Sequence, residues 1–171
     1  MANEFSDLAN ELLRRMAADQ HARGVRQDGR ASPDGEAMLA VDADNTAWLA
    51  SVFDRHGWPG HTLVGEEAAN AAWLLAQHAD ANPALQQRAL ELLTAAVDSE
   101  DATPRQLAYL TDRCQVNHSL PQTFGTQYTT GPGGELTPYP IENVDQLDER
   151  RARAGMEPHA EYDAVMRRTC S

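Results

Sequence analysis

The residues best suited to chemistry lie at the end of a segment that is otherwise apolar. Residues 66–79 are predicted to form a helix that is apolar nearly all the way round, and such a helix is normally buried at the centre of a domain. Its last turn nevertheless carries Gln77 and His78, and Asp80 follows. A buried polar side chain costs roughly 1–3 kcal/mol unless it is hydrogen-bonded. These residues therefore indicate either a ligand site or a structural hydrogen-bond network.

His78 is the leading candidate for proton transfer. A histidine titrates near neutral pH, so it can serve as a general acid or a general base. The other interpretation is a buried histidine whose ring is satisfied by a carboxylate or a carbonyl. Residues 66–79 contain too few polar positions to supply that partner. We therefore expect it to come from another helix or from a loop, and the groups available are Asp19, Asn45, Asp112 and Gln127.

Three helices other than 66–79 carry polar residues on faces that should be apolar. Asp19 and Asn45 continue the apolar stripes of their helices, and Asp112 and Arg113 lie late in a third helix. If Arg113 points inward, its planar guanidinium can donate two parallel hydrogen bonds to a carboxylate or a phosphate. The alternative is an ordinary Asp112–Arg113 ion pair at a helix end.

The loop at residues 122–127 has the composition of a binding loop. Gly125 permits close backbone approach to a ligand, and its neighbours offer hydrogen bonds. The alternative is a loop whose amides hold the C-terminal segment in place. The residues predicted to be catalytic are His78, Asp112 and Asp19. The residues predicted to bind substrate are Gln77, Arg113, Gln122, Thr126, Gln127 and Asn45.

Several kinds of chemistry find no support in the sequence. There is no HExxH, GxSxG, P-loop or GxGxxG motif, and the remaining histidines lack ligand spacing, so we expect no metal and no cofactor. Cys114 and Cys170 are far apart and form no CxxC motif, so free thiols are expected. Cys114 lies in phase with apolar residues of its helix, which favours a core position over a nucleophile.

Charge and hydropathy restrict the partners. The formal net charge of −12 argues against nucleic acid or an anionic membrane, because both require basic patches. No apolar run approaches the roughly 20 residues that span a bilayer, and the N-terminus lacks the regions of a signal peptide. We expect a cytoplasmic protein whose partner is a small molecule or a peptide. The sequence does not indicate an oligomeric state.

Hydrophobic spacing predicts a mainly α-helical bundle in one domain, residues 1–171, with a buried central helix. Asp42 or Asp44 is expected to cap the second helix, and Trp73 and Leu74 are expected in the core. A long loop is expected at 24–41, and a loop or small hairpin at 119–144. The predicted helices span residues 4–22, 42 or 44 to 56, 66–79, 82–98, 103–117, 145–153 and 158–168.

Four short motifs together resemble a known family. They are Gly-Trp-Pro at 57–59, Gln-His-Ala-Asp at 77–80, Leu-Thr-Asp-Arg at 110–113 and Phe-Gly-Thr-Gln at 124–127. Asp19-Gln20 precedes them and Asp-Glu-Arg-Arg at 148–151 follows. In order and spacing they are similar to an uncharacterised bacterial family, a domain of unknown function. The resemblance implies a small, mainly helical cytosolic domain and no catalytic assignment.

Two hypotheses of function follow. The first is a metal-independent acid–base enzyme acting on a small molecule or peptide, with His78 as the proton-transfer group. The motivation is the convergence of polar residues on an apolar helix. The second is a non-catalytic binding or interaction module, such as a partner-neutralising or biosynthetic accessory protein, in which the same residues form a structural network. The absence of a catalytic signature and the acidic composition favour the second.

Overall fold

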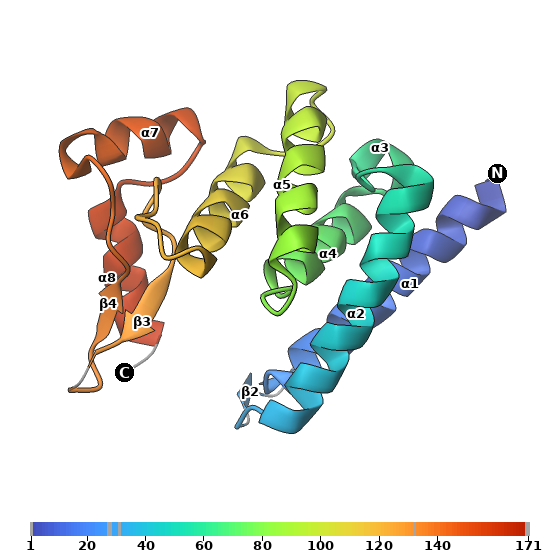
Figure 1. Cartoon of the computed structure of the whole chain (residues 1–171), viewed down its shortest axis with the longest axis horizontal. Helices are drawn as coiled ribbons and strands as arrows, with labels where there is room; N and C mark the ends of the chain where they lie inside the picture. The colour runs from blue at the N-terminus through green and yellow to red at the C-terminus, as the bar shows by residue number, and fades with distance from the viewer. Residues whose placement is uncertain (1, 27–28, 31, 132, 170–171) are drawn as a thin grey trace. The chain divides into compact units, whose positions relative to one another are not determined.

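The protein is mainly α-helical, as predicted. The computed structural model describes residues 2–26, 29–30, 32–131 and 133–169, and within them the chain forms eight α-helices and two short hairpins. The chain divides into two compact units, Met1–Ala102 and Thr103–Ser171 (Figure 1). The single domain over residues 1–171 stays a prediction. None of the described helices is long and apolar enough to cross a membrane.

The first unit is a helical bundle in which α1 contacts both α2 and α4. Its short hairpin pairs β1 with β2 in antiparallel fashion. Gly57 ends α2 with a φ of +69°, and Asn82 caps α5 by accepting a hydrogen bond from a backbone N–H. The elements of this unit are α1 (Ala2–Ala22), β1 (Val25–Arg26), β2 (Gly29–Arg30), α2 (Gly35–His56), α3 (His61–Val64), α4 (Glu66–Gln77) and α5 (Pro83–Asp98).

The central helix α4 is rich in buried alanines, which let neighbouring helices approach closely. Its buried residues are Ala68, Ala69, Ala71, Ala72, Leu75, Ala76 and Gln77. Trp73 and Leu74 are only partly buried, so their predicted core positions are wrong. The reason is helical phase, since both lie away from the alanine face. Trp58 is buried against Phe53, with ring centroids 5.8 Å apart, and covers the core.

The long loop predicted at 24–41 is wrong in two respects. Val25 pairs with Arg30 in the first hairpin, and α2 begins at Gly35. The cap is Asp34, whose side chain accepts the backbone N–H of Ala37 at 3.0 Å, so neither Asp42 nor Asp44 caps the helix. The first turns of α2 are largely exposed and lack an apolar stripe, so hydrophobic spacing could not reveal them.

The second unit contains three helices and the small hairpin predicted at 119–144. Thr103 and Gln106 form a capping box at the start of α6. In the hairpin, Tyr128 lies opposite Pro138 and Thr130 opposite Leu136. The elements are α6 (Pro104–Asn117), β3 (Tyr128–Thr130), β4 (Leu136–Pro138), a 3-10 turn (Val144–Gln146), α7 (Leu147–Arg153) and α8 (His159–Thr169).

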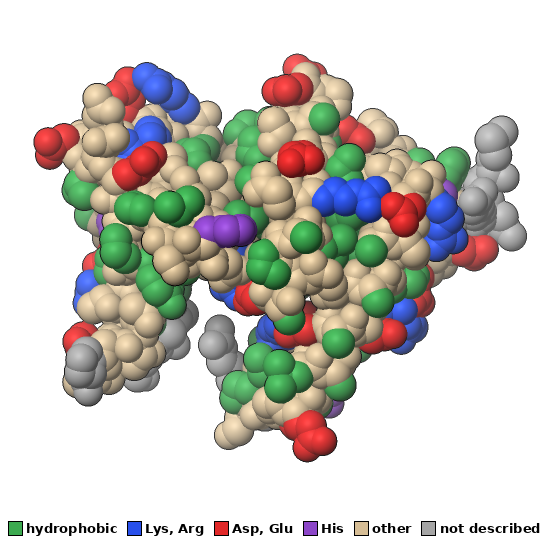
Figure 2. All heavy atoms as spheres, in the orientation of Figure 1, with side chains coloured by type: hydrophobic (Ala, Val, Ile, Leu, Met, Phe, Trp, Pro, Cys, Tyr) green, Lys and Arg blue, Asp and Glu red, His purple; other side chains and the backbone are tan. Residues whose placement is uncertain are grey.

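The acidic charge is spread over the surface. Figure 2 shows Asp and Glu side chains scattered over the visible face of each unit rather than gathered in one place. On the face shown, such a distribution suits a solvated surface.

Candidate functional site

His78 lies directly after α4 and is hydrogen-bonded to a buried carboxylate of α1. Its Nδ1 is 2.8 Å from Oδ1 and 3.0 Å from Oδ2 of Asp19. The Asp19 side chain is fully buried, whereas that of His78 is 18% exposed. Asp19 is one of the four groups that the sequence analysis named as possible partners, so the prediction that His78 finds its partner on another helix or in a loop is confirmed.

The contact with Asp19 determines which nitrogen of the His78 ring carries the proton when the ring is neutral. An ionised carboxylate can only accept, so Nδ1 must carry the proton that it donates to Asp19. In the neutral ring, Nε2 then bears the lone pair. Among the residues that the structure describes, none is hydrogen-bonded to Nε2 of His78. An imidazole held in this way can accept a proton at Nε2 and return it.

Asp19 is kept ionised by the groups around it. Burial alone would raise the pKa of this carboxyl, but the hydrogen bonds and charges of His78, Gln20 and Arg23 outweigh burial and hold the pKa below its ordinary value. Arg23 Nη1 donates to Asp19 Oδ1 at 2.8 Å, and Gln20 Nε2 donates to Oδ2 at 2.8 Å. Asp19 therefore carries the negative charge that a protonated His78 ring would need.

Arg23 also joins α1 to α2. Its Nη2 donates to both oxygens of Asp42, at 3.0 and 2.9 Å. Burial raises the pKa of the Asp42 carboxyl above its ordinary value, although Arg23 opposes the shift. Sequence reasoning missed Arg23 in this role. The signal was available, since Arg23 follows Asp19 by four residues, the spacing of an ion pair along a helix, although Arg23 itself lies in the turn directly after α1.

Two amide side chains of the first unit are buried with an unused donor. Asn45 Oδ1 accepts from Arg15 Nη1 at 3.0 Å, but Asn45 Nδ2 is buried without a hydrogen-bond partner among the described residues. The same holds for Nε2 of Gln77, at the end of α4. Both residues were predicted to bind substrate. Each unpaired donor costs roughly 1–3 kcal/mol, which an acceptor oxygen would recover.

In the second unit, Asp112 organises the 122–127 loop. Its Oδ1 accepts the backbone N–H groups of Thr123 and Phe124 at 2.8 and 2.9 Å. Its Oδ2 accepts the N–H and the hydroxyl of Thr126, both at 2.9 Å. Burial raises the pKa of Asp112, and these hydrogen bonds oppose the shift. Backbone N–H groups can only donate, so this geometry fits a carboxylate that positions the loop.

The two glutamines of the loop brace each other. Gln122 Nε2 donates to the carbonyls of Gln127 and Tyr139 at 3.0 and 2.9 Å, while Gln122 Oε1 accepts the Gln127 N–H at 2.8 Å. Gln127 Oε1 accepts from Arg113 Nη1 at 3.0 Å. Both side-chain hydrogens of Gln122 are therefore used on backbone carbonyls. The Arg113 guanidinium is hydrogen-bonded to the neutral amide of Gln127, at the end of the loop.

The predicted site residues thus divide between the two units, and the structure joins His78 directly only to Asp19 among them. His78, Asp19, Gln77 and Asn45 belong to the first unit, and Asp112, Arg113, Gln122, Thr126 and Gln127 belong to the second. The roles of all nine in catalysis or substrate binding stay predictions.

Comparison with known proteins identifies the family. A family model matches residues 6–169, a span that includes all four motifs. The chain belongs to DUF6624, a family of unknown function. The resemblance seen in the sequence is therefore confirmed. No curated protein and no solved structure gives a significant match to this DUF6624 chain.

A buried arginine of this DUF6624 chain escaped the sequence analysis. Arg151 on α7 is fully buried and donates to the carbonyls of Glu157 and Phe124, at 2.7 and 2.6 Å. Its guanidinium lies 5.0 Å from the ring centroid of Tyr162. The sequence of α7 is typical of a charged helix exposed to solvent. Only the carbonyl groups that accept its hydrogen bonds reveal that Arg151 is a core residue.

Metal and thiol chemistry receive no support from the described part of the DUF6624 chain. Within it, no three His, Cys, Asp or Glu side chains lie close enough together to hold a metal ion. Cys114 is a buried free thiol, as expected. Cys170 lies outside the described residues.

Proposed function

We propose that this protein is a metal-independent acid–base enzyme acting on a small molecule or peptide, with His78 as the proton-transfer group. One observation carries the proposal, the 2.8 Å hydrogen bond between His78 Nδ1 and the buried Asp19. In this arrangement Nε2 accepts a proton from the substrate, and the ionised Asp19 stabilises the cation that forms. The same nitrogen then returns the proton to the product or leaving group.

The buried amides of Gln77 and Asn45 support a substrate that carries acceptor oxygens. Gln77 precedes His78 directly, and both amides offer an N–H group that is unpaired among the described residues. A carbonyl or carboxylate oxygen is the natural partner for such donors. Amides, carboxylic acids and short peptides all provide one, which is the substrate class named in the proposal.

The alternative is a non-catalytic binding or interaction module, and one contact favours it. Arg23 joins Asp19 of α1 to Asp42 of α2, so the carboxylate next to His78 also belongs to an ion-pair network between helices. In this alternative, His78 completes the network and performs no proton transfer. Stability separates the two, because a network residue costs about 1–3 kcal/mol when truncated, whereas a catalytic residue often costs little.

The test compares the wild-type protein with His78→Gln on a complex mixture of substrates. Each protein is incubated with an extract of small metabolites and peptides, and the compounds consumed and produced are compared by mass spectrometry. General acid–base catalysis contributes typically 10²–10⁴-fold, so we expect compounds that the wild type consumes and the variant leaves. His21→Gln, which changes an exposed histidine on α1, is the matched control. Identical profiles for all three proteins, with His78→Gln destabilised, would favour the interaction module.

A further inference from the structure

A pocket of about 460 Å³ opens in the second unit between α6 and α7. Its size lies within the range of roughly 300–1,000 Å³ that is usual for small-molecule sites. The walls are mainly apolar and include Leu107 and Ala108 of α6, Phe124 of the loop and Ala154 beyond α7. All of its lining residues belong to the second unit, so the pocket is separate from the His78 contact in the first.

The charge of this pocket is opposite to that of the protein. The chain has a net charge of −12, yet the charged residues that line the pocket are Arg150 and Arg153. Among the residues that the structure describes, no carboxylate lines it. A local reversal of sign on an acidic protein favours a ligand with a negative charge. The apolar walls require that the rest of the ligand be apolar, since a fully hydrated anion would gain nothing from them.

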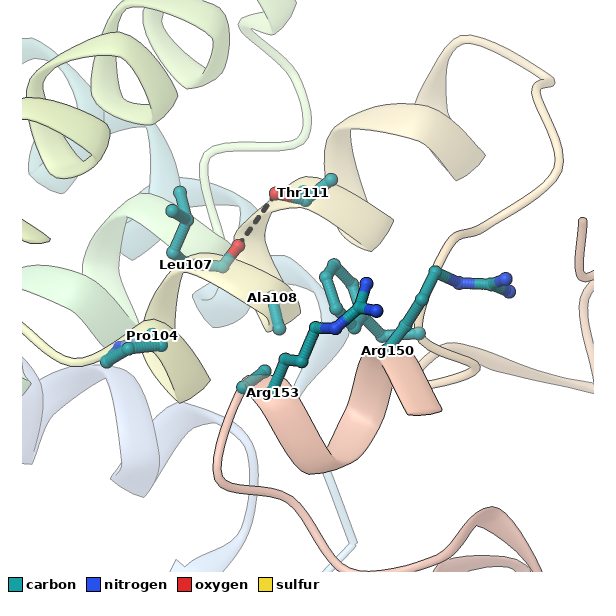
Figure 3. A pocket seen from close by; sticks show the side chains of 8 residues that line it. Pro104, Leu107, Ala108, Thr111, Arg150 and Arg153 are labelled. Atoms are coloured by element: carbon teal, nitrogen blue, oxygen red, sulfur yellow. Dashed lines mark hydrogen bonds between the residues drawn. The ribbon is translucent and has the colours of Figure 1, made fainter. Parts of the chain in front are cut away.

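The two arginines have different tasks. Arg150 donates to the carbonyls of Thr123, Asn143 and Glu142, so its guanidinium is committed to the loop. Figure 3 shows the Arg150 guanidinium extending away from Leu107 and Ala108. Arg150 thus forms a wall of the pocket and fixes its shape.

Arg153 is the group that can meet a ligand. Its side chain is 73% exposed, and its ion partner is Glu149, one turn earlier on the same helix and also exposed. Exposed pairs of this kind are weak, so a ligand anion can replace Glu149 at little cost. Figure 3 shows the Arg153 side chain extending from α7, with its guanidinium between Ala108 and Arg150 in this view.

We propose that this pocket binds a small amphipathic carboxylate. The apolar body of the ligand packs on Leu107, Ala108 and Phe124, and its carboxylate accepts hydrogen bonds from the Arg153 guanidinium. One planar guanidinium matches the two oxygens of one carboxylate. The pocket is an addition to the proposed acid–base function and does not depend on it.

The test uses four probes of similar size with the full-length protein. Octanoate and 4-phenylbutyrate carry a carboxylate, 1-octanol is uncharged and octylamine is cationic, and binding is measured by isothermal titration calorimetry or ligand-detected NMR. We expect both carboxylates to bind saturably and about tenfold more tightly than octylamine, a ratio that corresponds to 1.4 kcal/mol. Equal affinity for the acid, the alcohol and the amine would overturn the proposal, as would no saturable binding of either carboxylate.

Three variants locate the site. Arg153→Gln should weaken carboxylate binding about fivefold, the upper range for an exposed ion pair, and should leave 1-octanol binding unchanged. Arg168→Gln, an exposed arginine of α8, is the matched control and should change neither. Thr111→Phe fills the pocket and should abolish binding of every probe, with folding checked by circular dichroism. Carboxylate binding that survives both Arg153→Gln and Thr111→Phe would place the ligand elsewhere and refute the proposal.

Discussion

Removing the carboxylate of Asp112 should loosen the loop that it organises. In Asp112→Ala, the backbone N–H groups of Phe124 and Thr126 lose the acceptor that the structure gives them. The Thr123 N–H keeps a second acceptor, Gln115 Oε1 at 3.0 Å, and the Thr126 hydroxyl can rotate. Two orphaned donors, the buried N–H of Thr126 and the partly buried N–H of Phe124, therefore determine the cost.

The magnitude follows from those two donors. Each costs about 1–3 kcal/mol when it is left unpaired, so the sum is about 2–6 kcal/mol. The substitution also removes a charge whose burial raises the pKa of Asp112, and this relief offsets part of the loss. We therefore expect the free energy of unfolding of the second unit to fall by about 2–4 kcal/mol.

Two measurements test this prediction. Urea unfolding followed by far-ultraviolet circular dichroism gives the change in stability, and hydrogen exchange read by mass spectrometry gives the opening of residues 123–126. Asp145→Ala, which removes an exposed carboxylate of the same unit, is the control. A loss below about 0.5 kcal/mol, the range of ordinary surface substitutions, together with unchanged exchange in the loop, would show that Asp112 does not hold it.

Three further predictions concern individual contacts. In thermal unfolding, Gly125→Ala should lower the stability more than Gly155→Ala does. Both glycines have a positive φ, but a Cβ at Gly125 would lie 2.7 Å from a ring carbon of His159, whereas a Cβ at Gly155 meets nothing within 4 Å. Equal losses of stability would contradict the clash. Burial lowers the pKa of His159, so below about pH 6.5 the unfolded chain binds more protons than the folded unit. The free energy of unfolding should therefore fall as the pH drops. His159→Gln should flatten this pH profile, and an unchanged profile would exclude His159 as its source. Arg23→Gln removes the cation shared by Asp19 and Asp42. It should lower the free energy of unfolding, followed by tryptophan fluorescence, by about 1–3 kcal/mol, whereas Arg55→Gln, at an exposed arginine, should have a negligible effect. Similar small losses in both variants would refute the bridging role.

The aromatic residues make the assays selective. The three tryptophans all lie in the first unit, at positions 48, 58 and 73, and the four tyrosines all lie in the second. Tryptophan fluorescence therefore reports on the unit that contains His78, and near-ultraviolet tyrosine signals report on the unit that contains Asp112.

Local chemistry made part of the fold predictable. The caps of α5 and α6 rest on side chains within four residues of the helix start, so Asn82 and Thr103 could be recognised from sequence alone. The start of α2 could not, because its first turns bury little and carry no apolar stripe. Helical phase put Asp19 on the inward face of its helix and so among the four candidate partners of His78. Hydrophobicity alone misplaced Trp73 on a helix whose buried face is made mainly of alanines.

The candidate site was predictable only where it depends on helical phase. The loop at 122–127 is held by a carboxylate that meets backbone N–H groups, and such contacts leave no period in the sequence. The burial of Arg151 was even less predictable, because it depends on the backbone carbonyls of Phe124 and Glu157, which lie in other segments of the chain. Sequence patterns report which face of a helix is apolar, but not which distant carbonyls will accept from a charged side chain.

The tautomer of His78 is the measurement that tests the central claim most directly. Long-range ¹H–¹⁵N NMR spectra of the ¹⁵N-labelled protein, with His78→Gln for assignment, show which ring nitrogen carries the proton when the ring is neutral. The contact with Asp19 predicts a proton on Nδ1 and a bare Nε2, and Asp19→Ala should lose this preference. A neutral His78 with its proton on Nε2 in the wild type would contradict the account, because no basic nitrogen would then be available to a substrate.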